Sequence, residues 1–196
     1  MCQGKGRSCG SHAQHHRPLH GCAGRRSEAH DQAGDHRQCA AHLGLLLQHD
    51  GNHCHRNAGD RRARGQYPLG SFKAAGARMA AGTDFPVILP PSPFAGFKVG
   101  VTRTVPHDHP EYEQYKDVPM GPKENPLSEA VSLEDMIEMY TRRAAYQMFF
   151  DDVAGCLEAG KSADFVILNE TITQTEAEFL DRIQAESVYF KGHKIV

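Results

Sequence analysis

The first 66 residues of this chain lack whole classes of amino acid. Before Tyr67 there is no Val, Ile, Thr, Phe, Tyr or Trp, and the chain as a whole has no Trp. β-Branched and aromatic residues favour strands and provide much of the apolar surface of a core. Without them the segment cannot bury enough apolar area to offset the loss of chain entropy. The sequence therefore predicts no normal strand before Tyr67 and disorder over residues 1–60.

Other absences limit the class of protein. The apolar runs are only a few residues long, as in Phe165–Leu168, whereas a membrane span needs about 18 residues. The N-terminus is basic but has no apolar region, so no secretory signal is expected. A formal net charge of -2 gives no reason to expect nucleic acid or a membrane as partner. A cytoplasmic location is the default expectation.

His and Cys are concentrated before Tyr67, which holds ten of the thirteen His and five of the six Cys. Cys39, His42, His49 and His53 have spacings loosely like those of a zinc finger. An odd number of Cys without a signal peptide disfavours a disulfide framework. A third interpretation is that residues 1–60 are a frame-shifted or otherwise non-native sequence, since the mixture of Ala, Gly, Arg, His and Gln shows no selection for a core. We favour the third interpretation and keep the metal-binding module as the alternative.

From Tyr67 onward the composition is ordinary for a globular protein. Pro68 suits a first helical position, Leu69 and Phe72 have helical spacing, and Gly76 suits the residue after a helix. The small-sided run 77–81 is then consistent with a strand. It ends at Gly82-Thr83-Asp84, which places a carboxylate just past the strand. In a TIM barrel this end of a strand lies on the catalytic face.

The next segments are predicted to be a Pro-rich loop over residues 86–93 and a long surface loop over residues 103–127. His107 and His109 have H-x-H spacing in that loop, and we interpret them as surface residues rather than a metal-binding pair. Ser132 and Asp135 resemble a capping box that begins a helix. The apolar stripe of that helix is expected to be core and consists of Leu133, Met136, Ile137, Tyr140, Ala144 and Met148.

The last part of the chain changes from helical to β pattern. Residues 163–168 are predicted to be a strand. Residues 187–190 and 195–196 flank Lys191-Gly192-His193-Lys194 and are predicted to form a β-hairpin.

Several motifs together resemble one family. Residues 155–168 contain Gly, Leu, Glu, Gly, Lys, Ala and Asp in the order of a signature of the amidohydrolase superfamily. Residues 80–87, A-A-G-T-D-F-P-V, are similar to a segment of its amidohydrolase 3 branch, which includes N-substituted formamide deformylase-like enzymes. Residues 101–103 and 132–145 also resemble that branch. The resemblance begins near Gly59 and covers about two-thirds of the chain.

The resemblance implies an α/β fold, namely the C-terminal fragment of a TIM-barrel metal-dependent hydrolase with part of its small β-sandwich domain. Residues 61–154 would be the last part of the barrel and residues 155–196 part of the composite sandwich. Asp84 maps onto the family carboxylate that is a metal ligand or general base, so it is the candidate catalytic and metal-binding residue. The implied metal is a divalent ion, with zinc as first choice. The implied reaction is hydrolysis of a non-peptide carbon–nitrogen bond in a small amide or formamide.

Most of the family's metal ligands have no counterpart after Tyr67, where the only His are His107, His109 and His193. A zinc site needs at least three protein ligands, and a TIM barrel takes roughly 250 residues. We therefore expect that this chain alone neither binds the metal nor hydrolyses amides. The alternative is a non-enzymatic gene fragment or a small His/Cys metal-binding module.

Overall fold

The computed structural model describes residues 39–42, 64–83, 85 and 91–196. The described helices are α5 (Leu69–Ala74), α6 (Pro93–Thr102), α7 (Tyr112–Tyr115), α8 (Leu133–Tyr140) and α9 (Arg142–Gln147). Two 3-10 helices are η1 (Pro126–Glu129) and η2 (Ala177–Arg182). The strands are β1 (Cys39–His42), β2 (Met79–Gly82), β3 (Phe165–Leu168), β4 (Ala185–Phe190) and β5 (His193–Lys194).

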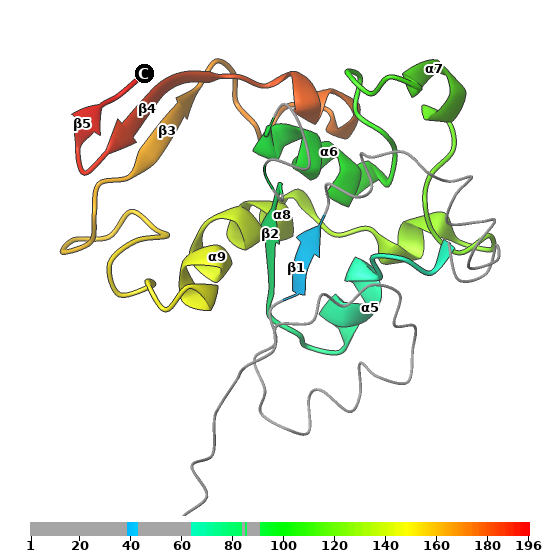
Figure 1. Cartoon of the computed structure of the whole chain (residues 1–196), viewed down its shortest axis with the longest axis horizontal. Helices are drawn as coiled ribbons and strands as arrows, with labels where there is room; N and C mark the ends of the chain where they lie inside the picture. Colours follow the sequence, from blue (N-terminus) through cyan, green and yellow to red (C-terminus); the bar gives the residue numbers. More distant parts are fainter. Residues whose placement is uncertain (1–38, 43–63, 84, 86–90) are drawn as a thin grey trace, which may run out of the picture.

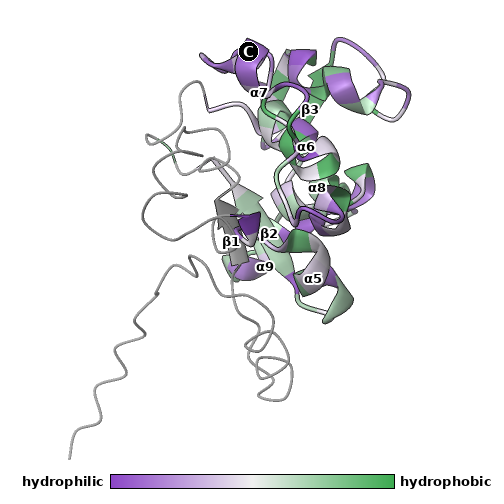
Figure 2. Ribbon diagram, turned by 90° about the vertical axis from the view of Figure 1, so that its right-hand side faces the viewer, coloured by the Kyte–Doolittle hydropathy of each residue, from purple (hydrophilic) through white to green (hydrophobic). Residues whose placement is uncertain are grey.

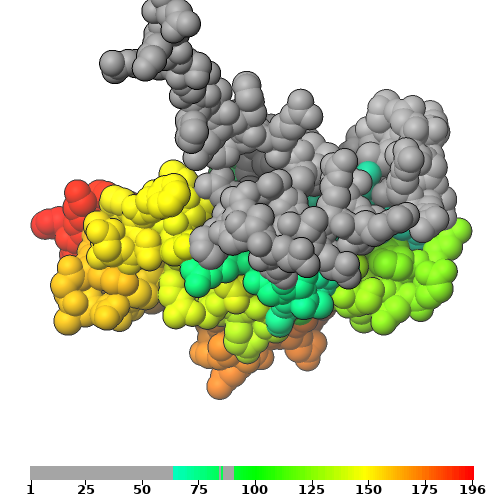
Figure 3. Space-filling view, turned by 90° about the horizontal axis from the view of Figure 1, so that it is seen from below, coloured from blue at the N-terminus to red at the C-terminus, as the bar shows by residue number. Residues whose placement is uncertain are grey.

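The described strands form two separate sheets. Strands β1 and β2 are parallel, with Cys39 opposite Met79 and His42 opposite Gly82. Strands β3, β4 and β5 form an antiparallel sheet in that order. Figure 1 shows the parallel pair in the middle of the molecule, among α5, α6, α8 and α9, and the antiparallel sheet at one end. In Figure 3 the C-terminal residues and the residues near 120 lie at opposite ends of the molecule.

Strand β1 lies within the segment for which the sequence predicted no strand, so that prediction is wrong for Cys39–His42. The physical reason is that a strand needs only backbone donors and acceptors opposite a partner. Strand β2 provides them over four residue pairs, and the tertiary pairing overrides the weak intrinsic preference of these residues. All other residues of the segment 1–60 lie outside the described part of the chain.

The helix–strand unit predicted after Tyr67 is confirmed as α5 followed by β2. Gly76 has a φ of +77°, which is the left-handed conformation that glycine adopts without steric cost. The backbone N–H of Ala77 donates to the carbonyl of Phe72 over 3.0 Å and closes the helix end. The chain then turns directly into β2, whose residues Met79 and Ala80 are buried.

Helix α6 was not predicted, because the prolines before it indicated a loop. Pro93 occupies the first turn of the helix, where its missing N–H removes no helical hydrogen bond. Ser92 caps the helix, since its side chain accepts from the backbone N–H of Ala95 over 3.5 Å. The proline cluster therefore ends at a helix start rather than continuing as a loop.

The helix predicted to begin at Ser132 is confirmed, including its capping box with Asp135. It does not continue unbroken, because Thr141 has φ -122° and ψ -97° and separates α8 from α9. The Thr141 hydroxyl donates to the carbonyl of Ile137 over 2.6 Å, a bond of the kind that disturbs helices. Met136 is fully buried but Met148 is 72% exposed. The apolar stripe is thus core in α8, and the prediction is wrong for Met148.

The C-terminal hairpin is also confirmed, with a tighter turn than the sequence suggested. Lys191 and Gly192 both have positive φ and connect β4 directly to β5, as in two-residue hairpin turns. The pairing continues beyond β5, because the backbone N–H of Ile195 donates to the carbonyl of Val188 over 2.8 Å.

One apolar core joins β2, the helices around it and η2. Figure 2 shows hydrophobic colour on β2 and mixed colour on the helices around it. The buried members of the core are Leu69, Met79, Phe97, Val99, Val131, Met136, Met139, Leu180 and Ile183. Because Leu180 and Ile183 belong to η2 or follow it, the C-terminal segment is anchored to the helical part through this core.

Two glycines allow a matched test of packing. A Cβ at Gly70 would lie 2.0 Å from the backbone oxygen of Ser128, whereas a Cβ at Gly82 would meet no atom of the described part of the chain within 4 Å. Gly70→Ala is therefore expected to lower the free energy of unfolding by about 1–3 kcal/mol. Gly82→Ala should leave it unchanged or raise it by up to about 1 kcal/mol. Urea unfolding measures both, and equal effects would contradict the close approach of α5 to η1.

Candidate functional site

Asp84, the candidate site residue predicted from the sequence, follows the last residue of β2 by two positions in the chain. His42 is the last residue of β1 and pairs in register with Gly82, the last residue of β2. Thr83 follows, and Asp84 and residues 86–90 lie outside the described residues. Phe85, which is described, is 66% exposed. Parallel strands bring their carboxyl ends to one edge of a sheet, where ligand sites of α/β proteins form.

The histidines after Tyr67 are placed differently from the prediction. His109 is only 8% exposed, and its Nδ1 accepts from the backbone N–H of Glu111 over 3.1 Å. The side chain of His107 is 19% exposed and contacts Asp181. The interpretation of both as surface residues is therefore wrong, because contacts with segments distant in sequence or with the loop itself cover them. His193 is exposed on β5.

The described residues contain no group of three His, Cys, Asp or Glu side chains that could hold a metal ion. His107 is engaged with Asp181, and His193 lies on the hairpin at the other end of the molecule. The alternative site of Cys39, His42, His49 and His53 lies outside the side chains that the structure describes.

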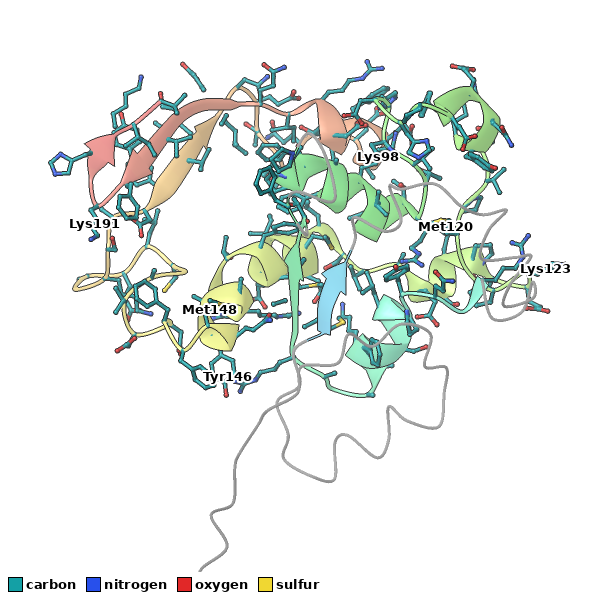
Figure 4. The ribbon with its side chains drawn as sticks, viewed as in Figure 1. Lys98, Met120, Lys123, Tyr146, Met148 and Lys191 are labelled. Carbon is teal, nitrogen blue, oxygen red and sulfur yellow. The ribbon has the colours of Figure 1, made fainter. Side chains whose placement is uncertain are left out.

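A buried cluster of charges lies between α6 and η2. The side chain of Lys98 on α6 is fully buried, and its Nζ lies 2.7 Å from Oε1 of Glu178 and 3.8 Å from Oδ2 of Asp181. The Nδ1 of His107 lies 2.9 Å from both carboxylate oxygens of Asp181 and 3.2 Å from Lys98 Nζ. In Figure 4 Lys98 lies where α6 faces the C-terminal segment.

Tyr112 of α7 completes this cluster. Its hydroxyl donates to Oε1 of Glu178 over 3.3 Å, and its ring lies 4.8 Å from the ring of His107. Desolvation and the nearby Glu178 carboxylate raise the pKa of Tyr112. The charged groups are thus satisfied by one another, as buried polar groups must be, and the cluster joins three segments rather than presenting a reactive group.

Sequence reasoning missed this cluster, although one signal was available. Residues 93–102 read P-F-A-G-F-K-V-G-V-T, in which Lys98 is the only charged residue. A single lysine in an apolar helix indicates a buried charge that needs a partner. The identity of the partners could not be read, because Glu178 and Asp181 lie about 80 residues further along the chain.

A second buried carboxylate joins α5 to α8. Asp135 forms ion pairs with Lys73 and with Nη2 of Arg143, the latter over 3.2 Å. Burial alone would raise the pKa of Asp135, but hydrogen bonds from Lys73 and Ser132 outweigh it and lower the pKa. The carboxylate therefore caps α8 and holds the end of α5 at the same time.

Arg103, in the family-like segment 101–103, is fully buried at the end of α6. Its Nε donates to the carbonyl of Met120 over 2.9 Å, and its Nη2 lies 3.5 Å from the carbonyl of Gln66. Nη1 has no hydrogen-bond partner in the described part of the chain. Burial lowers the pKa of the guanidinium to about 10. Arg103 therefore ties residues 66, 103 and 120 together.

No helix in the described ranges is long and apolar enough to cross a membrane.

Both the sequence and the structure of this chain are similar to those of amidohydrolases. Residues 11–196 match the model of the Amidohydrolase family. The structure resembles the crystal structure of an amidohydrolase from Thermotoga maritima MSB8, with a TM-score of 0.56 and 16% sequence identity. That likeness covers 87% of this chain and 34% of the solved one, so the chain spans about a third of its length. No curated protein matches.

The family match reaches further toward the N-terminus than the motifs read from the sequence. It begins at residue 11, whereas the motifs begin near Gly59. Strand β1 also lies before Tyr67 and pairs with β2. Both observations weigh against the hypothesis of a frame-shifted segment 1–60, which concerns the gene and stays a prediction.

Proposed function

The chain belongs to the amidohydrolase family, and we propose that it provides the C-terminal part of a metal-dependent hydrolase acting on non-peptide carbon–nitrogen bonds. The observation that carries this proposal is the family match over residues 11–196. In the proposed division, residues 61–154 are the last part of a TIM barrel and residues 155–196 belong to a small β-sandwich. The parallel pairing of β1 and β2 supports the first part, and the antiparallel sheet of β3, β4 and β5 supports the second.

We assign the catalytic and metal-binding role to Asp84. Two observations and one general rule support this assignment. The residue follows β2 by two positions, β2 is paired in parallel with β1, and catalytic groups of TIM-barrel enzymes follow the carboxyl ends of strands. A carboxylate in this place suits proton transfer to or from a reacting group.

Enzymes of this family are generally metal-dependent, and zinc is our first choice for the ion. The described residues do not fit a metal by themselves, because they contain no group of three possible ligand side chains. The other ligands of a complete site would have to come from outside the described residues. A small amide or formamide is the proposed substrate class.

The test is hydrolysis of N-substituted formamides and simple amides by the purified chain with added zinc, compared with Asp84→Asn. We expect no turnover above the blank for either protein, because most of the family's metal ligands have no counterpart after Tyr67, where the only His are His107, His109 and His193. Turnover that disappears in Asp84→Asn would contradict the expected inactivity and would demonstrate the role of Asp84. Turnover that persists in Asp84→Asn would refute the assignment of Asp84.

A further inference from the structure

A second feature of the structure concerns residues 107–119, which we call the strap. The strap follows α6, contains α7 and returns to Met120. Its base is closed by two hydrogen bonds. The backbone N–H of Met120 donates to the carbonyl of Arg103 over 2.8 Å, and Arg103 Nε donates to the carbonyl of Met120 over 2.9 Å. A surface loop with its ends held together in this way is an Ω-loop, a type that is frequently functional.

The strap is held to η2 by polar and ring contacts. Asp181 accepts from the backbone N–H of His107 and lies 2.9 Å from its Nδ1. Glu178 accepts from the Tyr112 hydroxyl over 3.3 Å. The ring of His107 stacks on Phe179 at 5.9 Å. These contacts fall on the short helix η2. Lys98 of α6 adds a contact of its Nζ with His107 Nδ1 at 3.2 Å and lies 5.2 Å from the centre of the Tyr112 ring, so η2 and α6 together hold the strap.

The apolar core does not hold the strap. None of the core residues, whether fully or partly buried, lies between 107 and 119. Leu180 and Ile183 anchor the opposite side of η2 in that core. The side of η2 that faces the strap is instead acidic and meets Lys98, whose Nζ lies 2.7 Å from Glu178.

We propose that the strap opens as a unit away from η2, and that contacts with Lys98, Glu178 and Asp181 hold it closed. Opening breaks the contacts of His107 and Tyr112 and admits water to the buried Lys98, while the core of α6, α8 and β2 stays folded. Segments with few buried apolar contacts open locally at lower free energy than the whole domain. The strap does not include Asp84, and this proposal does not depend on the hydrolase proposal.

The test is amide hydrogen exchange of the full chain, resolved by segment, in the wild type and in Glu178→Gln. Glu178 is 41% exposed in its side chain, so this substitution is expected to leave the fold intact. It removes the negative charge that pairs with Lys98 and accepts the hydrogen bond of the Tyr112 hydroxyl. Because hydrogen bonds to charged groups are stronger than neutral ones, the strap amides should exchange roughly tenfold faster. In the wild type and in the variant, strap amides should be less protected than amides of α8 and β2, because opening of the strap leaves that core folded.

The matched control is Glu113→Gln in the strap itself. Glu113 of α7 pairs over 2.7 Å with Lys116, which follows the helix, and its side chain is 83% exposed. Its loss should therefore not change exchange anywhere. A second variant, Asp181→Asn, should accelerate the strap at least as much as Glu178→Gln. The proposal is overturned if wild-type strap amides already exchange at unfolded rates. It is also overturned if wild-type strap amides are protected as strongly as amides of α8 and β2, or if neither η2 substitution affects the strap.

Discussion

Replacing Asp181 by alanine is expected to lower the free energy of unfolding by about 3–5 kcal/mol, the range seen when one partner of a buried charged pair is removed. The side chain of Asp181 is only 4% exposed. Its loss would leave the backbone N–H of His107 without its acceptor and would remove the contact of the carboxylate with His107 Nδ1. It would also leave the fully buried Lys98 with Glu178 as its remaining carboxylate.

Two further variants test whether the loss of stability comes from the buried charge of Asp181 or would follow the removal of any carboxylate. Asp181→Asn keeps an oxygen acceptor and should cost less than Asp181→Ala. Asp152→Ala removes an exposed carboxylate and should change stability by no more than about 0.5 kcal/mol. All three are measured by chemical denaturation at constant pH and salt. If Asp181→Ala and Asp152→Ala had the same effect, the buried cluster would not stabilise the fold.

Met139→Ala is expected to lower the free energy of unfolding by about 2–5 kcal/mol, as large-to-small changes in cores do. Met139 is 0% exposed and belongs to the core between α8 and its neighbours. The substitution removes apolar surface from the core and leaves a cavity that the surrounding side chains fill only in part.

The same substitution at Met148 is the control. Met148 lies just beyond α9, is 72% exposed and is labelled in Figure 4. Met148→Ala should shift stability by no more than about 0.5 kcal/mol. A large loss at Met148, or none at Met139, would show that the core is not the one described, and urea unfolding distinguishes these results.

Family membership was read correctly from motifs, but the site was only partly accessible to sequence reasoning. Asp84 was singled out because the family resemblance maps it onto a family carboxylate that follows a strand, and the structure describes that strand as β2. The residue itself lies outside the described part, so its role stays a prediction. The charged cluster of Lys98, His107 and Asp181 was not predicted at all, because its members come from three separate segments.

The sequence by itself determined the features that depend on near neighbours along the chain. Gly76 ends α5 because glycine takes a positive φ, Ser132 and Asp135 begin α8 through reciprocal bonds, and Lys191-Gly192 forms the hairpin turn. Each depends on residues within a few positions of one another. Local preference is enough to specify such features.

Only the tertiary structure decided the features that depend on distant segments. Strand β1 forms where residue preferences are poor, because β2 offers a ladder of backbone partners. His107 and His109 are covered rather than exposed, and Lys98 can be fully buried because carboxylates from η2 meet it. A buried charge is tolerated only when an opposite charge is brought to it. That partner is supplied by the fold and cannot be read from the residues beside it.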